Sequence, residues 1–205
     1  LLQKGICHMV RTLFHFVLAA MLLTSSLGTA LAQERVYIDI DSPSFQKFPV
    51  AVTDFNRLSP PSGEDLTVWF SGTLSSYLNM TGYFNIISKS AFLETPAPPP
   101  QGYETINYPN WSVIGAEYLV RGTYRQSASQ LSVEMRLYDV VKGQQLHGAR
   151  YTGRTEDRIA IVRKMAGDIL QVLTGDGRIF GTRIAYVAKK GKNTELRTIL
   201  FDGTS

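Results

Sequence analysis

The sequence is poor in cysteine and histidine, which limits the chemistry it can support. Its 205 residues include one cysteine, Cys7, and three histidines. Cys7 precedes Met9, the first methionine that can start translation, so the chain after Met9 has no thiol for a disulfide or for nucleophilic catalysis. His8 and His15 lie in the same N-terminal region, which leaves His147 alone. Because no His, Cys, Asp and Glu residues have the spacing of a metal site, we predict no catalytic residue, no metal and no cofactor.

The sequence also lacks a strong excess of charge of either sign. Lysine and arginine number 21 against 17 aspartates and glutamates, which gives a net charge of +4. Lys4 and Arg11 are the charged residues before Gln33, and without them the net charge falls to +2. Because the basic residues are scattered, this small excess does not indicate a nucleic acid as partner.

A hydrophobic run long enough to cross a membrane is missing, but a shorter run lies near the N-terminus. Arg11 is followed by apolar residues from Leu13 to Leu23, and small residues then lead to Ala30-Leu31-Ala32. This order is typical of a secretory signal peptide with an A-x-A cleavage site at Ala30 and Ala32. A retained membrane anchor is the alternative, but it needs about 20 apolar residues. We therefore predict export, with residues 1–32 removed, no membrane-spanning segment, and Gln33 as the first residue of the mature protein.

The first half of the mature chain predicts strands that alternate with a helix. Strands are expected at 35–40, 48–55 and 83–88, and the four prolines between residues 95 and 101 predict a loop. Ser62 and Asp65 form a capping-box pattern that predicts the start of a helix, which should end at Gly82. The apolar residues of this helix recur every three or four positions: Leu66, Trp69, Phe70, Leu74, Tyr77 and Leu78.

The second half predicts an antiparallel sheet and a second helix. A short helix or turn is expected at 110–115, and strands at 118–125, 130–141 and 146–152. Alternation predicts one buried face for the second of these strands, formed by Leu131, Val133, Met135 and Leu137. The helix should run from Thr155 to Gly175 with one apolar stripe, formed by Ile159, Val162, Ala166, Ile169 and Leu173. The predicted fold class is α/β with α+β character, in which two main helices cover one face of a small mixed sheet.

Residues 180–205 predict two strands joined by a turn and followed by Asp202-Gly203. A β-propeller blade begins in this way, but it needs four strands in about 40 to 45 residues. We therefore expect an incomplete blade and a protein that continues beyond residue 205. The predicted organisation has an N-terminal region at 1–32, a terminal segment at 33–44, an α/β domain at 45–176, and a linker with a truncated blade at 177–205.

Two groups of residues superficially suggest chemistry. Gly175-Asp176-Gly177 followed by Gly181 resembles a phosphate loop, but it precedes a strand, whereas the dinucleotide fingerprint follows a strand and opens a helix. An interdomain linker is the preferred interpretation. The acidic pairs Glu64-Asp65 and Glu156-Asp157 stand at predicted helix starts, where negative charge is favourable to the helix dipole.

Several segments, taken in order, resemble the TolB family of the Tol-Pal system. They are E-R-V-Y-I-D-I, F-P-V-A-V-T-D-F, Y-L-V-R-G-T-Y, L-S-V-E-M-R-L-Y-D-V and I-F-G-T-R-I-A-Y-V with a closing F-D-G-T-S. The resemblance covers residues 33–205. It implies a periplasmic binding protein with no catalytic activity, in which an N-terminal α/β domain precedes a six-bladed propeller.

The resemblance also implies two protein partners. In this family the propeller binds the lipoprotein Pal, and the N-terminal segment binds the C-terminal domain of TolA, in a system that keeps the outer membrane attached during division. By position this segment is 33–44, and its candidate contact residues are Glu34, Arg35, Val36, Tyr37, Ile38, Asp39 and Ile40. A terminal strand of this kind can add to a sheet edge of a partner. The alternative is that 33–40 forms an edge strand of its own domain.

Two other functions are also compatible with the sequence. The chain could be another periplasmic assembly or sensor protein that uses the same α/β module. It could also belong to a secreted propeller enzyme whose catalytic residues lie beyond residue 205.

Overall fold

The computed structural model describes residues 46–60, 63–94, 106–191 and 193–204, which all belong to one compact unit, residues 40–205. The predicted signal peptide, the strand expected at 35–40 and the proline-rich loop at 95–101 lie outside the described residues.

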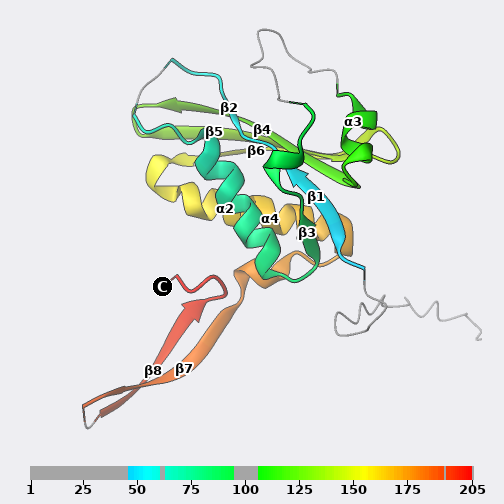
Figure 1. Ribbon diagram of the computed structural model, residues 1–205. Coiled ribbons are helices and arrows are strands. Elements are labelled where there is room, and N and C mark those ends of the chain that lie inside the picture. The colour runs from blue at the N-terminus through cyan, green and yellow to red at the C-terminus, as the bar shows by residue number, and fades with distance from the viewer. Residues whose placement is uncertain (1–45, 61–62, 95–105, 192, 205) are drawn as a thin grey trace, which may run out of the picture. The chain divides into compact units, whose positions relative to one another are not determined.

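A mixed sheet is the centre of the fold (Figure 1). Its strands are β1 (Phe48–Val52), β2 (Asn56–Arg57), β3 (Phe84–Ile86), β4 (Tyr118–Ser127), β5 (Gln130–Asp139) and β6 (Gln144–Arg154). They lie in the order β3-β1-β4-β5-β6, with β2 also beside β4. β1 is parallel to β3 and β4, whereas β4, β5 and β6 form antiparallel pairs. The predicted mixed sheet and α/β class are therefore confirmed.

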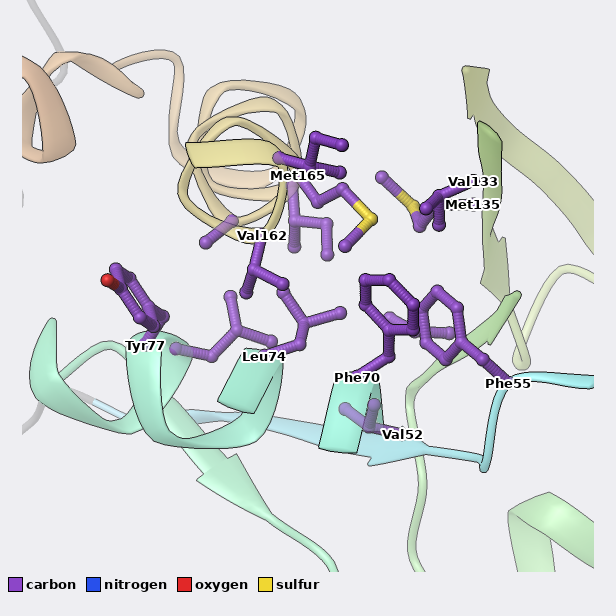
Figure 2. Packing of buried hydrophobic residues seen from close by; sticks show 14 of the residues in the cluster. Val52, Phe55, Phe70, Leu74, Tyr77, Val133, Met135, Val162 and Met165 are labelled. Carbon is purple, nitrogen blue, oxygen red and sulfur yellow. The ribbon is translucent and has the colours of Figure 1, made fainter. Parts of the chain in front are cut away.

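Two helices, α2 (Thr67–Met80) and α4 (Arg158–Thr174), cover one face of this sheet (Figure 1). Figure 2 shows side chains of both helices meeting those of β5 in one hydrophobic core, which includes Leu74, Val162 and Met135. These three side chains are 0% exposed. Since burying a large aliphatic side chain stabilises a fold by about 1.5 to 3 kcal/mol, this interface holds the domain together.

The start of α2 differs from the prediction. The helix begins at Thr67, so Asp65 precedes the first turn and does not occupy the third helical position that a capping box requires. Its Oδ1 accepts hydrogen bonds from the Thr67 N–H at 3.0 Å and from the Tyr124 hydroxyl at 2.8 Å. The capping-box prediction is therefore wrong, because Asp65 bonds to a strand of the sheet as well as to the helix terminus.

The buried stripe of α4 also differs in part from the prediction. Ile159 is 40% exposed, although its spacing had placed it on the stripe. A 3-10 turn, η2 (Thr155–Asp157), precedes the helix, and the buried face then combines two adjacent rows of side chains. The buried residues are Ile161, Val162, Met165, Ala166, Ile169 and Leu170. The predicted end is confirmed, since Gly175 caps the helix with a left-handed φ of 84°.

A smaller core lies on the other face of the sheet, beneath the short helix α3 (Tyr108–Val113) (Figure 1). Trp111 is 1% exposed and packs with four buried neighbours, Ala51, Ala116, Leu119 and Val140. Ala51 and Leu119 alternate with residues of the main core along their strands, so they point to the opposite face. The helix or turn predicted at 110–115 therefore starts two residues earlier and covers part of the second face.

One glycine of β4 is required by the main core. Phe55 is 0% exposed and lies directly against Gly122, where a Cβ atom would come within 2.1 Å of the Phe55 ring. Any larger residue at position 122 would displace this ring, which stacks on Phe70 at 5.4 Å. The contact joins the loop after β1 to the centre of the sheet.

The C-terminal residues form a separate two-stranded sheet. After the 3-10 turn η3 (Arg178–Gly181), β7 (Arg183–Lys190) pairs antiparallel with β8 (Asn193–Leu200). The predicted strand pair is confirmed, and this arrangement is compatible with part of a propeller blade.

Candidate protein-interaction sites

The residues predicted to contact a partner, Glu34 to Ile40, lie outside the described residues, as do Ala30, Ala32 and Gln33 of the predicted cleavage site. The candidate sites that the structure can describe are therefore elsewhere. The most connected of them surrounds Asp202, in the turn that follows β8.

Asp202 joins the C-terminal turn to both main helices. Its Oδ2 accepts hydrogen bonds from the Tyr77 hydroxyl of α2 and from Arg163 of α4, at 3.0 Å from Nε and 2.5 Å from Nη2. Its Oδ1 accepts from the Thr204 N–H at 3.0 Å and from the Thr204 hydroxyl at 2.7 Å. The side chain of Asp202 is only 3% exposed. A buried carboxylate with this many donors is a strong, geometrically specific link.

The electrostatics of this link keep Asp202 charged. Burial by itself would raise the pKa of Asp202, but hydrogen bonds from Tyr77, Thr204 and Arg163 outweigh burial and hold the pKa well below its ordinary value. Burial, and then the hydrogen bond to Asp202, raises the pKa of the Tyr77 hydroxyl, so Tyr77 stays a neutral donor. The cluster has the properties of an anchor, because all of its donors are already directed at one buried carboxylate.

Aromatic rings extend this anchor. Phe180, which is 4% exposed, lies 5.7 Å from the Tyr77 ring and 5.9 Å from the Phe201 ring, measured between centroids. The Phe201 N–H also donates to the Thr182 carbonyl at 3.2 Å. The beginning and the end of the strand pair are therefore fastened at one place, which we call the Asp202 anchor: Tyr77, Arg163, Phe180, Phe201, Asp202 and Thr204.

The Gly-Asp-Gly segment after α4 is packed and hydrogen-bonded internally. A Cβ atom at Gly177 would come within 2.2 Å of the Gly167 carbonyl oxygen, so only glycine fits against the helix. The Gly177 N–H donates to Gln171 Oε1 at 3.1 Å, and the Arg178 N–H donates to Asp176 Oδ1 at 3.0 Å. Both N–H groups are therefore used for hydrogen bonds within the connection after α4, as expected of a linker. A phosphate-binding loop would instead need these N–H groups to point outward.

Side chains that could bind a metal or take part in catalysis form few clusters in the described ranges. No group of three or more His, Cys, Asp and Glu residues there could hold a metal ion. The Ser71 hydroxyl donates to Asp54 at 2.5 Å, and Lys89 bonds both Asp54 and Ser71. These contacts tie α2 to the loop after β1 and to the 3-10 turn η1 (Lys89–Ala91), where they stabilise the junction of three elements.

The acidic residues at the predicted helix starts have structural partners. Hydrogen bonds lower the pKa of Asp65 to about 2, those from Thr67 more than the one from Tyr124. Asp157 Oδ2 accepts the Arg154 N–H at 3.2 Å, and hydrogen bonding from Arg154 lowers the pKa of Asp157. Within the described part of the chain, no helix is long and apolar enough to span a membrane.

Comparisons of the sequence and of the structure with known proteins indicate one family. The model of the TolB amino-terminal domain family matches residues 36–146. A Tol-Pal system protein TolB from Syntrophus aciditrophicus is 42% identical over 168 residues, which cover 82% of this chain and 37% of that protein. Another from Desulfosudis oleivorans is 31% identical over 194 residues, which cover 91% of this chain and 43% of that protein.

Among solved structures, the crystal structure of TolB from Acinetobacter baumannii is similar, with a TM-score of 0.61 and 26% sequence identity. The match covers 78% of this chain and 37% of that one. The chain therefore spans less than half of the length of these relatives.

Proposed function

The chain belongs to the TolB family, and we propose that it is a non-catalytic periplasmic component of the Tol-Pal system that links TolA to Pal. In this role it supports outer-membrane integrity and constriction during cell division. The observation that carries the proposal is the 42% identity to a Tol-Pal system protein over 82% of the chain.

The proposed organisation assigns a different role to each region. Residues 33–44 form the segment that binds TolA, residues 45–176 form the α/β domain that carries it, and residues 177–205 connect this domain to a propeller that binds Pal. The family match begins at residue 36, inside the proposed TolA-binding segment, which supports including that segment in the family's domain.

The strand pair supports the proposed connection to a propeller. Val187 and Leu196 are cross-strand partners on one face and are 68% and 76% exposed. Ile184 and Tyr186 lie on the other face and are 51% and 40% exposed. Blades of a propeller pack against neighbours on both faces, so apolar residues on both faces of β7 and β8 suit the start of a first blade.

The TolA assignment is tested by capture on an immobilised C-terminal domain of TolA. We expect the chain to bind, and a variant that lacks residues 33–44 to lose binding while its circular dichroism stays nearly unchanged. If a strand forms four to six main-chain hydrogen bonds at about 1 kcal/mol each, ordering costs leave a dissociation constant in the micromolar range. Equal capture of the deletion variant would contradict the assignment.

The periplasmic location is tested by the intact mass of the protein recovered from a bacterial periplasm. We expect a polypeptide that begins at Gln33, since cleavage should follow Ala32. A membrane-bound product that retains Met9 would contradict this part of the proposal.

A further inference from the structure

A pocket of about 700 Å³ lies at the end of the sheet where a hairpin joins β4 to β5, and we call it the hairpin pocket. Four segments and one side chain line it: residues 58–60, 125–127, 130–132 and 152–154, and Asp157. Small-molecule sites usually enclose about 300 to 1,000 Å³, so the pocket is large enough for a ligand of that kind. None of the lining residues belongs to the Asp202 anchor or to the proposed TolA-binding segment.

The strand register gathers polar side chains of the hairpin pocket on the face of the sheet that points away from α2 and α4. Leu131 belongs to the main core, so its neighbours in β5, Gln130 and Ser132, point to the opposite face. Two rows of cross-strand partners share this face: Arg125, Ser132 and Thr152 in one, and Ser127, Gln130 and Arg154 in the other. All six side chains are exposed or half-buried. Since directly opposite residues have Cβ atoms about 4.5 to 5.5 Å apart, a small ligand can contact several of them at once.

Arg125 supplies a positive charge that no acidic side chain of the pocket compensates. The charged residues among the lining are two arginines and one carboxylate, Arg125, Arg154 and Asp157, which gives a net charge of +1. Arg154 pairs with Asp157 at 3.3 Å and with Glu156 at 3.6 Å. Arg125 forms no ion pair within the described part of the chain. Its guanidinium presents donors in a planar fork, which fits a carboxylate or a phosphate through two parallel hydrogen bonds.

Hydroxyl and amide groups with unused hydrogen-bonding capacity line the same pocket. The Ser59 hydroxyl oxygen is held in place, because it accepts the Gln126 N–H at 3.1 Å and Arg57 Nε at 3.5 Å, and its own hydrogen remains to donate. Four other polar side chains of the lining make no hydrogen bond within the described ranges: Ser127, Gln130, Ser132 and Thr152. Because hydroxyl and amide groups both donate and accept, these side chains suit a ligand that carries several hydroxyl groups.

These properties select one class of ligand over others. A purely apolar ligand would take water from the Arg125 guanidinium and from the hydroxyl groups without replacing it, and unpaired polar groups are costly. A nucleic acid binds by neutralising several phosphates, for which a net charge of +1 is too small. Leu58 and Pro60 add an apolar part to the lining, against which the C–H groups of a sugar ring can pack. A small, hydroxyl-rich molecule with one acid group satisfies all of these groups.

We propose that the hairpin pocket binds a saccharide that carries a carboxylate or a phosphate group. Arg125 holds the acid group through its guanidinium. Ser132 and Thr152, which follow Arg125 in the same cross-strand row, bind hydroxyl groups of the sugar ring. This site is independent of residues 33–44 and of β7 and β8, so it does not rest on the proposed contacts with TolA and Pal.

The proposal is tested by nuclear magnetic resonance titration of the isotope-labelled chain with four probes: glucuronic acid, a glucose phosphate, glucose and inorganic phosphate. The titrations are made in about 0.15 M salt, which screens non-specific attraction of anions. We expect millimolar binding of at least one acidic sugar, with shifts of the amide signals of Arg125, Ser132 and Thr152. The tighter of the two acidic sugars identifies the acid group. Glucose and inorganic phosphate should bind at least about tenfold more weakly, because each lacks one part of the recognised ligand.

Three variants test the contacts one at a time. Arg125→Gln removes the charge and should weaken binding of the acidic sugar at least about tenfold. Arg125→Lys keeps the charge without the planar fork, so it should recover only part of this affinity. Ser132→Ala removes one hydroxyl group and should weaken binding about threefold to fivefold. Arg125 is exposed and Ser132 half-buried, so the circular dichroism of the variants should equal that of the wild type.

Arg183→Gln is the matched control, because it removes the same charge from β7, outside the pocket, and should leave binding unchanged. The proposal would be overturned if neither acidic sugar shifted the signals of the pocket, or if Arg125→Gln bound them with wild-type affinity. An equal loss in Arg183→Gln would show non-specific attraction of anions. Binding of inorganic phosphate as tight as that of the glucose phosphate, together with binding of glucose as tight as that of glucuronic acid, would also contradict recognition of an acidic sugar.

Discussion

The α/β region and the C-terminal strand pair contain similar strands in very different surroundings. In β5 the alternating residues Leu131, Val133, Met135 and Leu137 are 0–1% exposed, because α2 and α4 cover them. In β7 and β8, by contrast, apolar residues such as Val187 and Leu196 are more than 60% exposed. Alternating apolar residues are enough to form a strand, but they form a core only where a second layer, such as α2 and α4, packs on them. The strand pair is fastened to the rest of the unit chiefly through the Asp202 anchor.

The largest effect should come from removing a core side chain in the α/β region. Leu74→Ala deletes a side chain that is 0% exposed between α2 and α4, so the free energy of unfolding should fall by about 2 to 5 kcal/mol. Urea denaturation measures this loss. As the matched control, Leu196→Ala in β8 should cost less than about 0.5 kcal/mol, because Leu196 is 76% exposed. Similar losses in the two variants would remove the distinction between the two regions.

The Asp202 anchor should give an intermediate effect. Asp202→Asn leaves the Arg163 guanidinium without its carboxylate, and breaking a charged, buried hydrogen bond costs about 1.5 to 3 kcal/mol. We expect this variant to be cut faster than the wild type by a protease after Gly181, while the fragment up to Gly175 stays resistant. Limited proteolysis followed by mass spectrometry identifies the fragments. If the strand pair of the Asp202→Asn variant resisted cleavage as well as that of the wild type, Asp202 would not be the residue that holds it to the helices.

The contribution of Asp65 should be smaller and should depend on pH. Its pKa is lowered from 3.8 to about 2 in the folded chain, so the stability it contributes is fully present above about pH 4 and is lost as the pH falls toward 2. The Asp65→Asn variant should lack this pH-dependent contribution to stability. Urea denaturation of both chains between pH 5 and 2 should show their stabilities converging as the pH falls. A constant difference over this range would contradict the assignment.

Local patterns in the sequence predict much of the fold. β5 follows from alternation, and α2 and α4 follow from apolar residues at helical spacing, because each pattern lies within one element. The start of α2 is missed, since Asp65 bonds to Tyr124, which is 59 residues away. Similarly, the small core under α3 depends on Trp111 reaching Ala51 and Leu119 across the sheet.

The anchor could not be predicted from the sequence for the same reason. Asp202-Gly203 is recognisable as a turn, but Tyr77 is 125 residues from Asp202, and Arg163 is 39 residues from it. Nothing in the local pattern around Tyr77 or Arg163 marks them as partners of a turn. The sequence indicates residues 34–40 as a partner-binding segment through family resemblance, and this assignment stays a prediction.

The two ends of the chain have different proposed roles, and one titration separates them most directly. The C-terminal domain of TolA is titrated calorimetrically into the chain, into a variant without residues 33–44, and into a variant that ends at Gly181. We expect micromolar binding by the first and the third and none by the second, because we propose that residues 33–44 bind TolA and that the strand pair belongs to a propeller that binds Pal. Binding that survives loss of residues 33–44, or that disappears with β7 and β8, would contradict the account.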